Sequence, residues 1–82
     1  MGYKSRAKRL AEAENIIADA KSRVEELKNE LENWRDNLPE NLQSSNKADQ
    51  LEEAISNLED IISSLEEAEG NCSSVEFPGM YG

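Results

Sequence analysis

The sequence has no histidine and only one cysteine, Cys72, among its 82 residues. The lack of histidine excludes the Glu-x-x-His sites of di-iron bundles and the histidine-containing sites that bind zinc. A single cysteine cannot form a disulfide within the chain. Cys72 follows a predicted helix C-terminus, whose negative end does not activate a thiolate. We therefore predict a protein that is not an enzyme and has no cofactor, no metal site and no catalytic residue.

Proline, glycine and aromatic residues are also scarce, with two prolines, four glycines and 5% aromatics, whereas 33% of the residues are charged. This composition is typical of long helices and coiled coils, and it argues against a β-sandwich or an α/β enzyme. No apolar run is long enough to span a membrane. The basic start is followed by Ala-Glu-Ala-Glu at residues 11–14 instead of the apolar segment of a signal peptide. We predict a cytoplasmic protein without membrane contact.

Charge is distributed unevenly along the chain, which carries a net charge of −9. Residues 1–45 are almost neutral, whereas residues 46–82 contain Lys47 as their only basic side chain and nine acidic ones. An acidic surface repels the phosphates of nucleic acids, so we predict no direct nucleic-acid binding. The same surface attracts basic regions of other proteins.

A seam of apolar residues spaced alternately by three and four defines the first half of the chain. This spacing is the heptad pattern of a long amphipathic helix that needs a partner, and Pro39 disfavours its continuation. We predict a helix over about residues 4–37 and a loop over 38–45, where Pro39 equally suits the start of a short helical turn. The seam consists of Leu10, Ala13, Ile17, Ala20, Val24, Leu27, Leu31, Trp34 and Leu38.

A second seam with the same spacing predicts a helix over about residues 46–69. Ser45 or Asn46 suits its N-cap, and Asn46 followed by Asp49 resembles a capping box. Gly70 suits the residue that ends the helix. Residues 71–82 then form an apolar C-terminal tail. The second seam consists of Ala48, Leu51, Ile55, Leu58, Ile62 and Leu65.

The short connection predicts an antiparallel, coiled-coil-like helical hairpin of the all-α class over residues 1–70. In heptad notation, Leu10 and Ala48 are at a positions and Ala13 and Leu51 at d positions. The e positions at residues 21, 28 and 35 of the first helix are then basic and those of the second are acidic, and e positions face each other in antiparallel pairs. One register therefore forms ion pairs that specify orientation. A register one heptad along instead places Trp34 opposite Ala48, a large residue against a small one. The ion pairs of the first register are Arg35–Glu52, Lys28–Glu59 and Lys21–Glu66.

The apolar stripe is wider than a two-helix seam requires, because Ile16, Ala54, Ile61 and Ala68 occupy g positions. Roughly the first ten to twenty residues of the longer first helix also extend past the second helix. We predict that two hairpins form a homodimeric four-helix bundle, or that the tail covers the overhang. The hairpin or dimer interface is predicted to contain Leu10, Ile17, Leu27, Leu31, Trp34, Ile55, Leu58, Ile61, Ile62 and Leu65.

Two groups of residues are candidates for contact with other molecules, although charged helix faces are usually just solvated and apolar tails usually dock on their own helices. The first group would bind a protein with a basic surface. The second, as an alternative, would bind a small anion such as a nucleotide signal and make the oligomer a sponge for it. A structural or assembly coiled coil is a further alternative. The first group contains Glu52, Glu53, Glu59, Asp60, Glu66, Glu67, Phe77, Met80 and Tyr81, and the second contains Lys4, Arg6, Lys8 and Arg9.

The run Trp34–Ser45, followed by a helix rich in Glu, Ala and Leu, resembles small uncharacterised helical-hairpin proteins encoded by bacteriophages and prophages. The Phe77–Met80 ending shares this resemblance. The resemblance implies a role in binding and blocking a host or phage protein, for example to counter a host defence, in the cytoplasm of the host cell. It implies no activity and assigns no functional residues.

Overall fold

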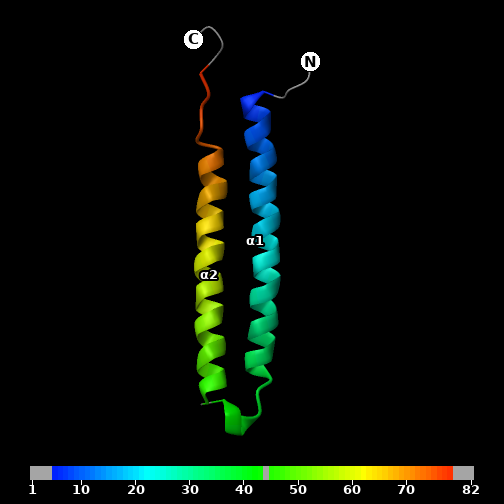
Figure 1. Cartoon of the computed structure of the whole chain (residues 1–82), viewed down its shortest axis with the longest axis vertical. Coiled ribbons are helices and arrows are strands. Elements are labelled where there is room, and N and C mark those ends of the chain that lie inside the picture. The colour runs from blue at the N-terminus through cyan, green and yellow to red at the C-terminus, as the bar shows by residue number, and fades with distance from the viewer. Residues whose placement is uncertain (1–4, 44, 79–82) are drawn as a thin grey trace.

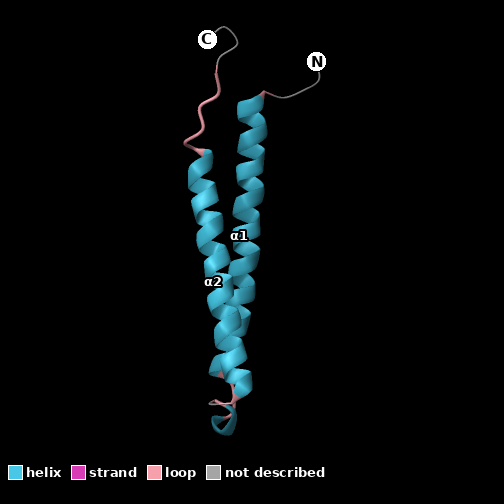
Figure 2. Ribbon diagram, turned by 60° about the vertical axis from the view of Figure 1, so that its left-hand side comes forward, coloured by secondary structure: helices cyan, strands magenta, loops and turns pink. Residues whose placement is uncertain are grey.

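A computed structural model describes residues 5–43 and 45–78, and this part of the chain is helical without any strand. Helices α1 (Arg6–Asp36) and α2 (Asn46–Cys72) lie side by side and antiparallel, joined through the short 3-10 helix η1 (Glu40–Leu42) (Figure 1). Figure 2 shows that the two helices cross at a shallow angle, as in a coiled coil. The predicted helical hairpin is therefore confirmed.

Helix α1 begins at Arg6 because Ser5 is its N-cap. The Ser5 side chain accepts a hydrogen bond of 3.1 Å from the backbone N–H of Lys8, which satisfies one of the free donors of the first turn. At the other end, Asn37 caps the helix, and its side-chain amide donates to the Asn33 carbonyl at 2.8 Å. No proline or glycine interrupts the 31 residues between these caps.

The connection contains the short helical turn that Pro39 permits. Pro39 lies immediately before η1, and its carbonyl accepts a hydrogen bond of 2.8 Å from the N–H of Leu42. Ser45 is the N-cap residue of α2, but its hydroxyl donates to the Leu42 carbonyl instead of capping the helix. The capping box expected between Asn46 and Asp49 is therefore absent, since Asn46 is already the first residue of α2.

The prediction that Gly70 ends the second helix is wrong, because α2 continues through it to Cys72. Gly70 does not adopt the left-handed conformation of a helix-terminating glycine. Its carbonyl instead accepts hydrogen bonds from the backbone N–H of Ser73 at 3.2 Å and from the Ser73 hydroxyl at 2.9 Å. These bonds move the helix end to Ser73, and α2 reaches 27 residues.

The register of the hairpin is the one that forms the predicted ion pairs. Arg35–Glu52, Lys28–Glu59 and Lys21–Glu66 are all present, with nitrogen–oxygen distances of 3.8, 4.0 and 3.9 Å. The alternative register, with Trp34 packed on Ala48, is wrong.

The buried residues explain the rejection of the second register, because Leu38 packs with Ala48 and Leu51 in one cluster at the closed end of the hairpin. Leu38 is 8% exposed, whereas Trp34 is 49% exposed. Farther along α2 only Ile55 and Ile62 are buried, and α1 has no buried residue. The core of a single hairpin is therefore small and is concentrated on α2.

Candidate interaction surface

One edge of the hairpin is closed by charged side chains that cross between the helices. Lys21, Lys28 and Arg35 of α1 keep only 25, 24 and 32% of their side chains exposed while they reach the acids of α2. Their aliphatic stems lie along the apolar seam while their charged ends stay in contact with water. The charged groups of this edge are therefore paired with each other.

Among the ion pairs between the described helices, Lys21 makes the shortest, with its Nζ 3.2 Å from Oε1 of Glu69. The hydrogen bond to Glu69 raises the pKa of Lys21 above its ordinary value of 10.5, with partial desolvation opposing the shift. A raised folded-state pKa means that this contact stabilises the hairpin below pH 10.5 and that its contribution is lost as the pH rises above the folded-state pKa. It holds the last turns of α2 against α1.

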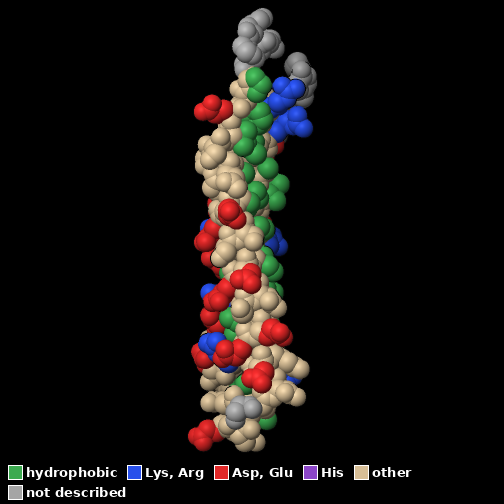
Figure 3. All heavy atoms as spheres, turned by 90° about the vertical axis from the view of Figure 1, so that its left-hand side faces the viewer, with side chains coloured by type: hydrophobic (Ala, Val, Ile, Leu, Met, Phe, Trp, Pro, Cys, Tyr) green, Lys and Arg blue, Asp and Glu red, His purple; other side chains and the backbone are tan. Residues whose placement is uncertain are grey.

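The opposite edge is open and apolar. Figure 3 shows hydrophobic side chains in a band along one side of the rod, with most of the acidic side chains away from it. Ile16 is 70% exposed, and Leu27, Trp34 and Ile61 are each almost half exposed. We call this surface the apolar stripe. It consists of the apolar residues at d and g positions that are not buried: Ala13, Ile16, Ala20, Leu27, Trp34, Ala54, Leu58, Ile61, Leu65 and Ala68. The g positions of α1 also carry Arg9, Arg23 and Glu30, which interrupt the stripe on that helix.

The stripe is flanked on α2 by uncharged residues only. The exposed c positions of this helix, which border the stripe, are Gln50, Asn57, Ser64 and Asn71. All the acidic residues of α2 lie on its remaining faces. A chain of net charge −9 thus keeps one neutral strip along its most acidic helix. Contiguous apolar surface with a neutral border is typical of a protein–protein contact.

Trp34 lies at the closed end of the stripe and is not a core residue of the single hairpin. The Nζ of Lys47 lies 5.5 Å from the centroid of its ring, in a cation–π contact that covers part of one face. The rest of the indole remains exposed. Large aromatic side chains that are half exposed at the edge of an apolar surface are common anchors in protein interfaces.

The acidic residues predicted to bind a partner fall into two groups. Glu52, Glu59 and Glu66 are engaged by α1 in the ion pairs described above. The other three lie at f positions, pointing away from α1, and are exposed without an ion pair to any described residue: Glu53, Asp60 and Glu67. Of the two groups, only the second is free of ion pairs within the described chain and can contact a partner with all of its carboxylates.

At the open end, the tail follows the first turns of α1, which extend beyond α2. Val75 and Phe77 line a hollow together with Ala7 and Leu10, and are 48% and 39% exposed. The described tail thus runs beside the overhang and leaves both Val75 and Phe77 exposed. Of the tail residues predicted to contact a partner, Phe77 is described, whereas Met80 and Tyr81 lie outside the described residues.

The basic residues of the anion-binding alternative are only partly brought together. Arg6 and Arg9 line a second hollow with Leu10, Ala13 and Phe77. Lys8 does not line it, and Lys4 lies outside the described residues. A hollow lined by two arginines and three apolar residues could accept an amphiphilic anion.

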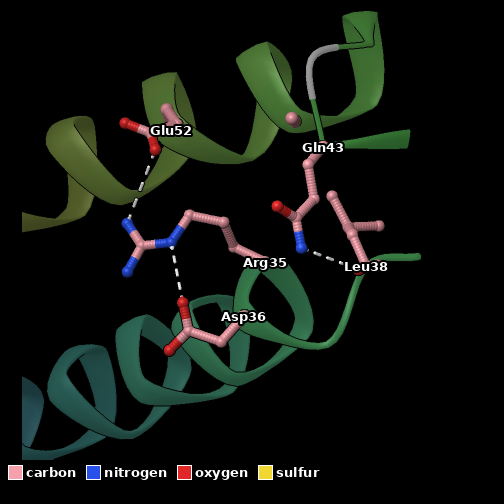
Figure 4. Close-up of a pocket in the computed structure, with 6 residues that line it drawn as sticks. Arg35, Asp36, Leu38, Gln43 and Glu52 are labelled. Atoms are coloured by element: carbon pink, nitrogen blue, oxygen red, sulfur yellow. Dashed lines mark hydrogen bonds and ion pairs between the residues drawn. The ribbon is translucent and has the colours of Figure 1, made fainter. Parts of the chain in front are cut away.

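A third hollow, of about 300 Å³, lies beside the loop at the closed end (Figure 4). Arg35 reaches toward both Asp36, at 3.3 Å, and Glu52, and the Gln43 amide donates to the Leu38 carbonyl at 3.1 Å. The polar groups of this hollow therefore bind each other. They fasten the loop to the helices and leave no set of groups directed at a ligand.

Chemical sites of other kinds do not emerge from residues 5–43 and 45–78. They contain no group of three or more acidic or cysteine side chains arranged to hold a metal ion. Neither described helix is long and apolar enough to cross a membrane. The apolar stripe and the acidic f positions of α2 are thus the surfaces that the geometry singles out.

No family model, curated protein or solved structure matches this chain. The resemblance to small phage-encoded proteins accordingly stays a prediction.

Proposed function

We propose that this chain is a non-enzymatic interaction protein that self-associates through its apolar stripe and presents the acidic side of α2 to a partner protein. The observation that carries the proposal is the stripe itself, which follows both helices and has a neutral border on α2. A single hairpin leaves Ile16, Leu27, Trp34 and Ile61 in water. Burying a fully exposed side chain of this kind contributes roughly 1.5–3 kcal/mol, and about half of that is still to be gained where the side chain is already half buried.

The small core of one hairpin supports self-association. Helix α1 has no buried residue, and the buried residues elsewhere are Leu38, Ala48, Leu51, Ile55 and Ile62. Chains of this size rarely gain more than roughly 3–5 kcal/mol from a single core, and oligomerisation is a usual remedy. Two hairpins that face each other through the stripe would form a four-helix bundle with a continuous apolar centre.

Sedimentation equilibrium of the full-length chain under reducing conditions tests self-association. We expect a species of twice the 9.2 kDa chain mass at micromolar concentration, which dissociates on dilution. Only monomer over the whole range would refute the self-association. Continued growth of mass with concentration would instead support an open-ended structural coiled coil.

The acidic side of α2 is the surface proposed to bind the partner, because Glu53, Asp60 and Glu67 follow one line along the helix and lack ion pairs in the described chain. A basic protein surface would complement them. By its resemblance to phage proteins, the chain would inhibit the partner it binds, in the cytoplasm of a host cell. The sponge alternative depends on Arg6 and Arg9 alone among the described residues.

Neutralising the three acids is expected to weaken capture of bacterial host proteins by the immobilised chain. The variant combines Glu53→Gln, Asp60→Asn and Glu67→Gln, and its binding should be at least about tenfold weaker than that of the wild type. Binding by the wild type should weaken by a similar factor when the salt concentration rises from about 50 to 500 mM. Replacing Ser56 and Ser63 by asparagine provides a control without charge change. If both variants capture the same proteins regardless of salt, the acidic side of α2 is not the binding surface, and the proposal of self-association is unaffected.

A further inference from the structure

The d positions of the apolar stripe have a size gradient along α1, whereas Ile16, at a g position of the first half, is large. The d positions in the first half of the helix are the small residues Ala13 and Ala20, and those in the second half are the large residues Leu27 and Trp34. None of the four is buried in the hairpin. A surface that is thin at one end and bulky at the other complements an inverted copy of itself.

We propose that a second copy docks stripe to stripe in the inverted direction, with the two α1 helices antiparallel about a two-fold axis level with Arg23. This arrangement rests on the self-association proposed above. Trp34 of each copy then lies level with Ala13 of the other, and Leu27 lies level with Ala20. Large side chains fill the space above small ones, as close packing requires.

The other symmetric arrangement keeps both open ends together. Given the register of the hairpin, it sets Ala20 level with Ala68 of the other copy and Leu27 level with Ile61 of the other copy, while Trp34 lies level with Ala54. A layer of two alanines leaves a void and a layer of Leu27 with Ile61 is crowded, and both are destabilising. These two central layers favour the inverted pairing.

Charge at the two ends favours the same arrangement, whereas the centre brings the two Arg23 side chains next to each other and Glu30 next to Ile16 of the other copy. The exposed start of α1 is basic through Arg6, Lys8 and Arg9, whereas the exposed residues Asp36 and Glu40 lie near the closed end of the hairpin. Inverted pairing places the start of each α1 level with the closed end of the other copy. Pairing with the open ends together would bring the two basic starts to the same end.

The dimensions are those of a specific interface. From Ala13 to Trp34 the stripe is about 32 Å long, and two adjacent helices are about 20 Å across. Inverted pairing would bury roughly 650 Å² on each copy, or about 1,300 Å² in the pair, within the range of about 1,200–2,000 Å² for stable complexes. It also brings the closed end of one copy alongside the α1 turns of the other that extend beyond α2.

Disulfide trapping in a Cys72→Ser background tests this geometry, because a disulfide requires Cβ atoms about 3.5–4.5 Å apart. Arg23→Cys lies at the axis and should link to itself, at least about tenfold more than Asn29→Cys on the outer face. Ile16→Cys should link to Glu30→Cys in a mixed sample. These positions are at g and f sites of α1.

Efficient linking of Ile16→Cys to Ala68→Cys, without linking of Arg23→Cys to itself, would overturn the inverted pairing in favour of the arrangement with both open ends together. Sedimentation of the unlinked Cys72→Ser chain separates the two proposals. A dimer with the wrong cross-links refutes only the geometry. A monomer refutes self-association and the geometry with it.

Discussion

Replacing Leu51 by alanine is expected to remove most of the free energy of unfolding of the hairpin. Leu51 is 4% exposed and packs with Leu38, Ala48 and Leu31 at the closed end of the hairpin. Removing a buried leucine side chain costs about 2–4 kcal/mol. That loss approaches the roughly 3–5 kcal/mol that a core of this size supplies. Urea unfolding followed by far-ultraviolet circular dichroism measures the change.

Leu42→Ala is the matched control for this experiment. Leu42 lies in η1 and is 40% exposed, so the same truncation removes far less buried surface there. We expect its free energy of unfolding to change by less than about 1 kcal/mol. Similar losses for both leucines would mean that the cluster around Leu51 does not dominate the stability of the hairpin.

Placing a charge on the apolar stripe is expected to abolish self-association without unfolding the hairpin. In the single hairpin Ile61 is 45% exposed, so a glutamate there remains hydrated. In the dimer the same carboxylate would be buried without a partner, once on each copy. We expect Ile61→Glu to raise the dissociation constant at least about 100-fold, or about 2.8 kcal/mol. Sedimentation equilibrium measures this change.

Ser63→Glu adds the same charge two residues away, on an exposed position outside the stripe. It controls for the extra repulsion between two acidic chains, and we expect the dimer to persist. Circular dichroism should show an unchanged helix content for both variants. If Ile61→Glu remains dimeric, Ile61 lies outside the contact and the stripe is not the docking surface.

The register of the hairpin was predictable only as one of two alternatives, because a shift of one heptad would still pair Lys28 with Glu52 and Lys21 with Glu59. Only the observed offset gives all three basic residues, Lys21, Lys28 and Arg35, an acidic partner. Packing arguments were less decisive. The expected layer of Trp34 against Ala48 failed because Leu38, the last residue of the seam, fills the space beside Ala48 instead.

Gly70 shows why helix ends are harder to predict than helices. Glycine often ends helices, but here Glu69 is held by Lys21 and Ser73 caps the Gly70 carbonyl, so the helix extends beyond it. The sequence pattern could not reveal these contacts, because they depend on the tertiary register and on a capping side chain that follows the glycine.

The candidate surface was only partly predictable. The g positions of Ile16 and Ile61 indicated a wide stripe, and both residues are exposed. The heptad pattern alone could not show which acids remain available. That distinction between Glu52 and Glu53, for example, became clear only when Arg35 was seen to engage the former.

Because the buried residues are concentrated at the closed end, the two helices are held together most firmly there and less firmly toward the open end. Leu38, Ala48 and Leu51 join segments that are close in sequence, so this end closes with little loss of chain entropy and would form early in folding. Beyond Ile62 no described residue is buried, so the two helices separate from each other at that end with the smallest cost in free energy. Cargo fused to either terminus would therefore be attached to the end that opens first (Figure 1).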